Sequence, residues 1–268
     1  MFDFVLSGWR SGLRGHSFRG LAVLAVALLG LAYLAAGFSA RQPQSVALDV
    51  GLSGLRFSLV LMALFWVQEL MTREVERRTV NLTLAYPIDR AAYVLGRFVA
   101  IAGLLLTAVV VLGAALWLAT RYSSGGYTQA RPVQLGLPYW IALLGIWLDV
   151  LVVTAFGVML ASLSTVAILP LAVGAAFAIA GKTLGPVMDF LFVREAEGIE
   201  GLAERYSPII DTLRWFLPDL SRLDWRPWPM YGLQIETPIM LWSALMAIGY
   251  SALMLAIAVL VFRRREFG

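Results

Sequence analysis

The sequence predicts an all-α membrane protein with six transmembrane helices. About 60% of its 268 residues are apolar and 14% are charged, whereas soluble proteins have roughly 45–50% apolar and 25% charged residues. The mean hydropathy is +0.80. The apolar residues also form six runs close to the length of about 20 residues that a helix needs to cross a bilayer. This composition excludes a soluble globular protein, because one core cannot shield so much apolar surface from water.

The predicted elements begin with a short segment before the first apolar run. Residues 1–17 place their apolar side chains on one helical face, which predicts an amphipathic helix in the membrane interface. The alternative is an unstructured basic start, because Gly8, Gly12 and Gly15 weaken a helix. A six-helix domain follows over residues 18–262. Its predicted spans are Leu21–Phe38, Leu55–Met71, Phe98–Thr120, Leu137–Ala161, Val166–Phe192 and Pro238–Phe262.

An even number of spans places both termini on one side of the membrane, and the distribution of arginine selects that side. The N-terminal segment, the connection between spans two and three, and the tail 263–268 carry 11 arginines in short stretches. The other side carries eight arginines in longer loops. The sequence therefore predicts that both termini lie in the cytoplasm.

Residue types that build catalytic and metal sites are scarce. The chain has no cysteine and one histidine, His16, which excludes disulfide frameworks and histidine metal clusters. Gly181-Lys182-Thr183 resembles the end of a phosphate-binding loop, but the required glycine five positions earlier is Ala176. No basic stripe interleaved with aromatic residues suggests nucleic acid as a partner. We expect no enzyme activity, metal or cofactor in this chain, and any ATP to be bound by another protein.

The most informative region is the connection over residues 72–97. Glu74 and Arg78 form an acid-first pair at four-residue spacing, which favours a helix. Pro87 ends this helix, and Asp89 is positioned to cap the helix of span three. The alternative is a solvent-exposed charged loop, which is the more common structure for a stretch with this many charged residues. Its length and its mixture of apolar and charged residues favour docking onto a partner.

The same region resembles the cytoplasmic signature of ABC transporter permeases of the ABC-2 type. That signature has an acidic residue, a basic residue or glycine before threonine, a leucine-rich stretch, a proline followed by serine or an acid and arginine, and a Leu-Gly-basic entry to span three. The matching residues are Glu74, Glu76, Arg77, Arg78, Thr79, Leu82, Leu84, Pro87, Asp89, Arg90 and Leu95-Gly96-Arg97. In size and layout the chain is also similar to the membrane subunits of the copper-processing transporters that mature nitrous-oxide reductase.

The resemblance implies an ABC-2 (type V) exporter-like fold in the bacterial inner membrane. The permease would work as a homodimer with two copies of a separate ATPase, which would bind ATP and magnesium. Its cargo would be lipid-like or hydrophobic, since the spans are mainly Ala, Leu, Val and Gly; otherwise the dimer would transmit motion to a periplasmic partner. The residues expected to couple to the ATPase are Glu74, Glu76, Arg77, Arg78, Thr79, Leu82, Pro87 and Arg90.

An ion-driven secondary transporter is the alternative, and its support comes from charges inside the spans. Asp149, Lys182 and Asp189 lie within predicted spans, where a charge costs about 2.5–3.5 kcal/mol at the helix centre. Asp149 and Lys182 lie at similar depth, so we expect them to pair, either within one protomer or across the dimer. The other possibility is that Lys182 extends outward and Asp149 faces a water-filled cleft.

The outer loop, residues 193–236, has apolar residues at three- and four-residue steps, which predicts amphipathic helix. Pro208 interrupts the pattern, so we expect two short helices or a kinked one across the outer mouth. The run 217–225 is expected to be a turn-rich link to span six. The resemblance implies that this region forms an exit gate, and a passive cap is the alternative. The gate residues would be Tyr206, Ile209, Leu213 and Phe216.

Overall fold

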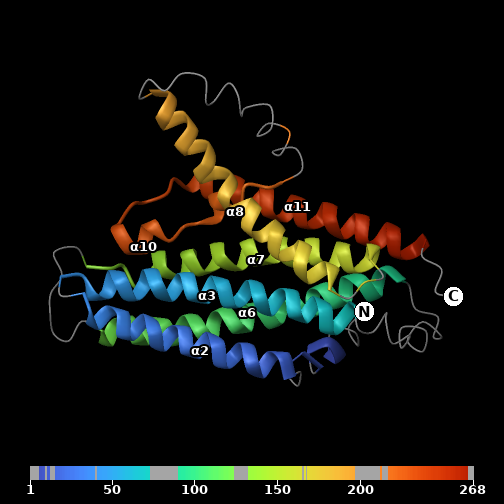
Figure 1. The fold of residues 1–268 in the computed structure, drawn as a ribbon, viewed down its shortest axis with the longest axis horizontal. Coiled ribbons are helices and arrows are strands. Elements are labelled where there is room, and N and C mark those ends of the chain that lie inside the picture. Colours follow the sequence, from blue (N-terminus) through green and yellow to red (C-terminus); the bar gives the residue numbers. More distant parts are fainter. Residues whose placement is uncertain are drawn as a thin grey trace.

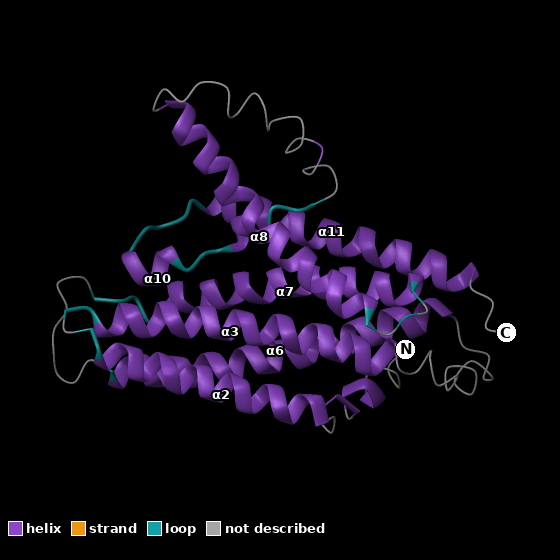
Figure 2. Cartoon of the chain, viewed as in Figure 1, coloured by secondary structure: helices purple, strands orange, loops and turns teal. Residues whose placement is uncertain are grey.

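Six long helices form the structure, a computed structural model (Figure 1). They are α2 (His16–Gly37), α3 (Pro43–Val67), α6 (Arg90–Tyr122), α7 (Leu137–Leu163), α8 (Leu169–Ala196) and α11 (Thr237–Arg264). All six are long and apolar enough to cross a membrane. The structure describes residues 6–9, 11–12, 16–39, 41–72, 90–123, 132–164, 166, 168–196, 212 and 217–264, and all regular structure in them is helical (Figure 2). The prediction of an all-helical, multi-pass membrane protein is confirmed at this level.

The helices alternate in direction through the bundle (Figure 1). We call one end of the bundle the terminal end, because α2 begins there and α11 finishes there. The opposite end, where α2 leads into α3 and α6 leads into α7, is the far end. At the terminal end, Nη1 of Arg90 donates to the carbonyl oxygens of Phe262 and Arg263 at 3.4 and 3.1 Å. The first residue of α6 thus caps the last turn of α11, where carbonyl groups lack helical partners.

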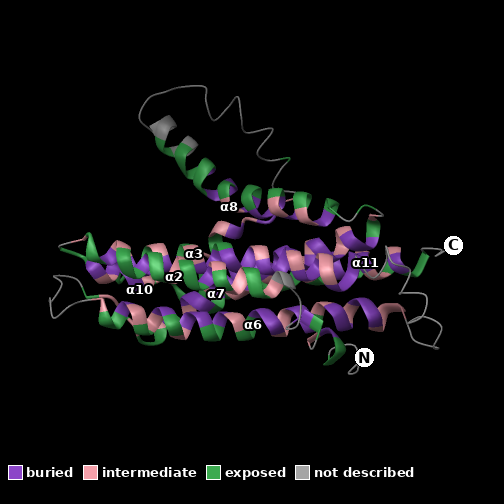
Figure 3. Ribbon diagram, turned by 60° about the horizontal axis from the view of Figure 1, so that its bottom comes forward, coloured by how far each residue is buried: buried purple, intermediate pink, exposed green. Residues whose placement is uncertain are grey.

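The centre of the bundle is formed by α3 and α7, the two helices with the largest buried share. α2 packs mainly on α3, and α11 packs mainly on α7. The buried residues gather on the facing sides of these helices (Figure 3). The hydroxyl of Tyr139 in α7 donates to the carbonyl of Gly113 in α6 at 2.6 Å, which joins two helices through a backbone oxygen inside the core.

Three spans start several residues earlier than the hydropathy predicted. α2 begins at His16 rather than Leu21. α3 begins at Pro43 rather than Leu55, which places the buried Arg56 near its middle. A proline is favourable at the first position of a helix, whereas hydropathy alone assigns the polar first half to a loop. α3 ends in the π-helix η1 (Gln68–Thr72). α6 begins at Arg90, eight residues before the predicted start.

α8 contains Pro186, and beyond it the helix leans away from the bundle (Figure 1). Proline has no N–H, and its ring clashes with the carbonyl of residue i−4, so a helix bends there. Residues 217–226, which we call the inserted segment, pack against α8 just before this proline, at Gly181 and Gly185. They include the 3₁₀ helix η2 (Leu220–Leu223) and lead into α10 (Pro227–Tyr231).

The inserted segment lies inside the bundle, not in a link outside it. Its Leu220, Leu223 and Trp225 are 0, 0 and 3% exposed. The carbonyl oxygen of Leu223 lies where a Cβ on Gly145 would be only 2.6 Å away. Gly145 is eight residues into α7, about 12 Å from the far end at 1.5 Å per residue. The run 217–225 has the predicted turn-rich character, with a bend and the 3₁₀ helix η2, but its apolar side chains pack against α7 and α8 and do not lie outside the bundle.

Part of the predicted N-terminal helix is described, and it contacts the bundle. Residues 6–9 and 11–12 are helical. The indole Nε1 of Trp66 donates to the carbonyl of Gly12 at 3.2 Å, and Trp9 lies against Gly103 of α6. The interfacial placement of the whole segment 1–17 stays a prediction, since its other residues before α2 lie outside the described ones.

Candidate functional site

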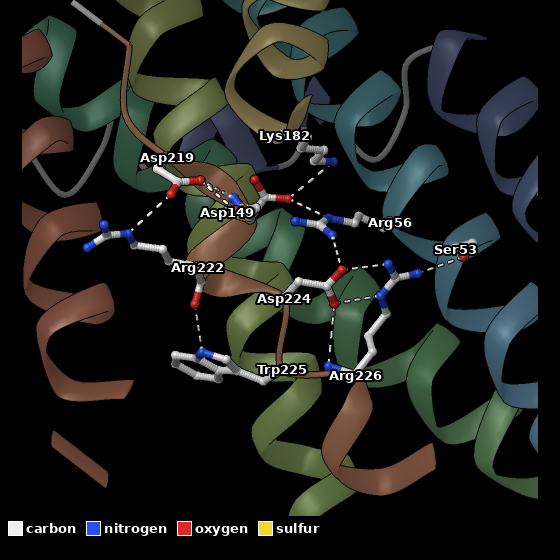
Figure 4. Close-up of polar contacts among 10 residues, drawn as sticks. Ser53, Arg56, Asp149, Lys182, Asp219, Arg222, Asp224, Trp225 and Arg226 are labelled. Carbon is white, nitrogen blue, oxygen red and sulfur yellow. Dashed lines mark hydrogen bonds and ion pairs between the residues drawn. The ribbon is translucent and has the colours of Figure 1, made fainter. Parts of the chain in front are cut away.

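A cluster of charged side chains lies in the middle of the bundle (Figure 4). α3 contributes Arg56, α7 contributes Asp149, and α8 contributes Lys182. The inserted segment contributes Asp224 and Arg226. Each of the three helical residues is 12 or 13 positions from the first residue of its helix, which is about 18–20 Å along the axis. The cluster therefore lies far from both ends of the bundle.

Asp149 is the fully buried carboxylate of the cluster, at 0% exposure. Its Oδ2 accepts a hydrogen bond from Nε of Arg56 at 2.7 Å and lies 3.2 Å from Nζ of Lys182. One carboxylate oxygen therefore joins α3, α7 and α8. The expected pairing of Asp149 with Lys182 is present within one chain. The alternative, in which Lys182 extends away from Asp149, is not found.

Arg56 connects the helices to the inserted segment. Its side chain is 8% exposed, and its Nη1 donates to Oδ2 of Asp224 at 3.3 Å. The sequence analysis missed this residue, because the predicted second span began at Leu55 and the arginine count assigned Arg56 to neither side. The signal that identifies it is Pro43, which starts a helix long enough to place Arg56 near its middle.

Asp224 and Arg226 form the most complete pair in the cluster. Nε and Nη2 of Arg226 donate to Oδ1 and Oδ2 of Asp224, both at 2.6 Å, in the two-pronged geometry that makes arginine–carboxylate pairs strong. Nη1 of Arg226 donates to the hydroxyl of Ser53 at 2.7 Å. Burial alone would raise the pKa of Asp224, but the hydrogen bonds and charge of Arg226 and the charge of Arg56 lower this pKa below its ordinary value.

A second acid–base pair holds the shape of the inserted segment. Asp219 accepts hydrogen bonds from the backbone and hydroxyl of Ser221 at 3.2 and 2.5 Å, and from Nε of Arg222 at 3.1 Å. The carbonyl of Arg222 accepts from the indole of Trp225 at 3.0 Å. A Cβ on Gly185 of α8 would overlap the hydroxyl of Ser221. The segment therefore neutralises its own charges, and α8 has no side chain where the segment crosses it.

The cations of the cluster face a cleft of about 350 Å³ between α3 and α8. Two buried polar atoms next to it have no hydrogen-bond partner among the described residues, Oδ1 of Asp149 and Nη2 of Arg56. A buried polar atom without a partner costs about 1–3 kcal/mol. The cleft is lined by Ser53, Arg56, Phe57, Val60, Leu61, Ala175, Ala178, Ile179, Lys182 and Arg226.

The other predicted site residues are not part of this cluster. Asp189 is exposed on α8 beyond Pro186. Arg90 is described as the cap of α11. Most of the predicted coupling residues (Glu74, Glu76, Arg77, Arg78, Thr79, Leu82 and Pro87) and all gate residues (Tyr206, Ile209, Leu213 and Phe216) lie outside the described residues. Their roles stay predictions.

Comparison with known proteins gives no assignment. No protein-family model matches the sequence, and no curated protein matches it at a significant level. Within the described part of the chain, no group of three or more acidic or histidine side chains could hold a metal ion. The features of the chain that bear on its function are the signature in residues 74–97, the topology and the charged cluster.

Proposed function

We propose that the chain is the membrane-spanning permease subunit of an ATP-driven transporter of the ABC-2 type. It works as a homodimer in the bacterial inner membrane with two copies of a separate ATPase, and both of its termini are cytoplasmic. The observation that carries the proposal is the signature over residues 74–97. Its position supports this, because η1 ends and α6 begins at the terminal end, where Arg90 contacts the last turn of α11. Short arginine-rich segments favour the cytoplasm, where the ATPase binds ATP.

In this proposal, closure of the two ATPase subunits moves the connection and with it the ends of α3 and α6. Arg56 carries the movement of α3 to Asp149 in α7 and to Asp224 in the inserted segment. Ion pairs at 2.7 to 3.3 Å have defined geometry, so a shift of α3 changes the position of α7, α8 and the inserted segment together. The result is export of a lipid-like or hydrophobic cargo, or transmission of motion to a periplasmic partner.

The test is the response of a co-expressed ATPase to changes in the connection. A double variant, Glu76→Ala with Arg78→Ala, removes two charged docking groups, so ATP turnover of the assembled complex should fall about tenfold. The variant should insert and purify as the native chain does. Glu236→Ala is the matched control, since this exposed acid precedes α11 at the far end.

Equal ATP turnover and equal ATPase affinity in the native and double-variant complexes would exclude the connection from the mechanism. Failure of the tagged chain to co-purify with any ATPase that contains nucleotide-binding motifs would overturn the proposal as a whole.

The second candidate is an ion-coupled secondary transporter that uses Asp149 and Lys182. The observation in its favour is that ionisable residues meet in the middle of the membrane-spanning bundle, next to a cleft, where such residues often mark an ion path. However, Oδ2 of Asp149 already binds two cationic groups of the protein, so a transported cation would have to displace one. Uptake by the purified chain alone in liposomes with a proton or sodium gradient, lost in Asp149→Asn, would favour this candidate.

A further inference from the structure

We infer that the cleft between α3 and α8 binds the anionic head of an amphiphile, a carboxylate or phosphate group carried on an apolar chain. Three observations support this inference. They are the sign of the charges that face the cleft, the donors that are left available there, and the apolar walls. No residue of the predicted ATPase connection takes part in the site.

The charges that line the cleft are positive. Arg56, Lys182 and Arg226 line it, and no acidic residue of the described part of the chain does. The carboxylates of Asp149 and Asp224 hold these cations without lining the cleft. Asp49 of α3 adds a further negative charge near Arg226, but it does not line the cleft either. A ligand in the cleft therefore meets the cations directly, which favours an anionic head.

Hydrogen-bond donors from α3 and α8 remain for such a ligand. Nη2 of Arg56 has no partner among the described residues, but it is buried, so the side chain must move before this group can reach a ligand. The ammonium of Lys182 has three N–H groups, one ion-pair partner in the described structure, and 26% exposure toward the cleft. The hydroxyl of Ser53 accepts from Arg226, so its own hydrogen is available. Oxyanions accept several charge-assisted bonds of this kind at once.

The walls of the cleft suit an apolar chain. Phe57, Val60 and Leu61 come from α3, and Ile179 comes from α8. Phe57 and Ile179 are 57 and 66% exposed on the outside of the chain, where a membrane protein meets lipid. The volume of about 350 Å³ is at the lower end of the range of about 300–1,000 Å³ for small-molecule pockets. It admits the head and the first part of a chain, and the remainder would run along Phe57 and Ile179.

The inference deepens the proposed function and depends on it only for the role of the amphiphile as cargo. Binding is a property of this chain alone and requires neither ATP nor the ATPase. A negative binding result would therefore overturn the site and leave the permease proposal standing, and absence of an ATPase partner would do the reverse.

The experiment is native mass spectrometry of the purified full chain in neutral detergent. The probes are phosphatidylglycerol and oleate, with phosphatidylcholine and sodium phosphate as controls. We expect one phosphatidylglycerol or one oleate per chain. If only one of them binds, the site distinguishes a phosphate head from a carboxylate head. If both bind, the site recognises any anionic head on an apolar chain. Binding of phosphatidylcholine equal to that of phosphatidylglycerol would overturn the inference. So would inorganic phosphate that occupies the site and prevents oleate and phosphatidylglycerol from binding.

Two pairs of variants locate the site. Ala175→Phe fills the cleft without changing charge, and Arg226→Gln removes one cation; each should weaken binding about tenfold or more. Ala172→Phe, on an exposed position of the same helix, and Arg222→Gln, on the arginine that pairs with Asp219, lie outside the lining and should bind as the native chain does. If Arg226→Gln fails to fold, the binding measured for Ala175→Phe alone tests whether the amphiphile occupies the cleft. Native-like binding by folded Ala175→Phe, or equal losses in the controls, would overturn the site.

Discussion

Asp149 shows how a single carboxylate is retained inside a membrane-spanning bundle. Its exposure is 0%, and removing a carboxylate from water costs several kcal/mol. Arg56 and Lys182 offset that cost through one oxygen. Because such pairs roughly balance their own desolvation, the pairs are better explained as fixing the relative positions of α3, α7 and α8 than as adding stability.

Replacing Asp149 by Asn should be strongly destabilising. The change leaves Arg56 and Lys182 close together without the negative charge that they share, and breaking a buried pair in this way costs about 3–5 kcal/mol. Lys182→Met should cost much less, because Lys182 is 26% exposed and Asp149 keeps Arg56. Unfolding of the purified variants in detergent measures both values.

The double variant Asp149→Asn with Lys182→Met completes the test of the pair. Once Asp149 is neutral, removing the Lys182 charge relieves repulsion from Arg56, so the double variant should be more stable than the sum of the single losses implies. Strict additivity would show that the two side chains do not interact.

The environment of Asp224 predicts how the stability of the folded chain changes at low pH. Its pKa is lowered in the folded chain, so the unfolded chain binds the proton more readily, and the stabilisation is fully present at neutral pH. It should be lost as the pH falls from the ordinary value of 3.8 through the lowered one. In Asp224→Asn this part of the acid sensitivity should disappear, although the variant is less stable at every pH. Melting temperatures between pH 7 and about pH 2 measure the difference, since the loss occurs below the ordinary pKa of 3.8. Equal slopes for the two chains would contradict the assignment.

At the scale of elements, the inserted segment depends on helices that offer no side chain at the crossing. The carbonyl of Leu223 approaches Gly145 of α7, and Ser221 approaches Gly185 of α8. α8 is bent at the neighbouring Pro186 (Figure 1). The segment and the two helices therefore fit as a unit, and a methyl group at the crossing is enough to displace it.

Gly145→Ala should destabilise the chain although alanine is the better helix former. The new Cβ would lie 2.6 Å from a backbone oxygen, and a backbone group cannot move aside as a flexible side chain can. Gly249→Ala in α11 is the matched control, since nothing lies within 4 Å of its added Cβ; there the helix propensity gains up to about 1 kcal/mol. Thermal unfolding of both variants gives the comparison. A Gly145→Ala protein as stable as the native chain would show that the segment does not lie against α7.

Hydropathy predicts the elements whose apolar side chains are stable in contact with lipid and need no specific partner. The six spans are of this kind, and all six are found. The charged middle of α3 and the inserted segment are not. The charge of Arg56 is neutralised by residues far away in sequence, and the apolar residues of the inserted segment are buried against distant helices. Arg56 needs Asp149, 93 positions later, and Asp224, 168 positions later. The spacing of Asp219 with Arg222 and of Asp224 with Arg226 is the local sign that this run carries its own neutralising partners.

For the whole molecule, the ends of the described chain meet at one end of the bundle. Arg90 bonds the last turn of α11 there, and the connection that resembles the ABC-2 signature begins and ends beside it. Any motion of that connection therefore enters the bundle next to both termini. The sidedness of the bundle in the membrane decides whether a cytoplasmic ATPase can reach this connection.

The predicted sidedness is testable with single cysteines at Thr79 and Gly201, because the chain has no native cysteine. An impermeant thiol reagent added to intact cells should label position 201 and leave position 79 unlabelled until the membrane is opened. The cysteine-free native chain controls for background. Labelling of position 79 alone from outside would reverse the orientation and remove the proposed contact with an ATPase.

The inserted segment also constrains how the protein is made. α3, α7 and α8 leave the ribosome before residue 224, and until then Arg56, Asp149 and Lys182 carry one uncompensated positive charge between them. Asp224 binds Arg56 only when the segment enters between helices already in the membrane, and Arg226 enters with it, so the net charge of the cluster does not change. The segment has three charged residues from 222 to 226 and is too polar and short to insert alone. We therefore expect the bundle to close in a late step, when the segment packs against α7 and α8, and quality-control proteases acting before that step would meet an unfinished protein.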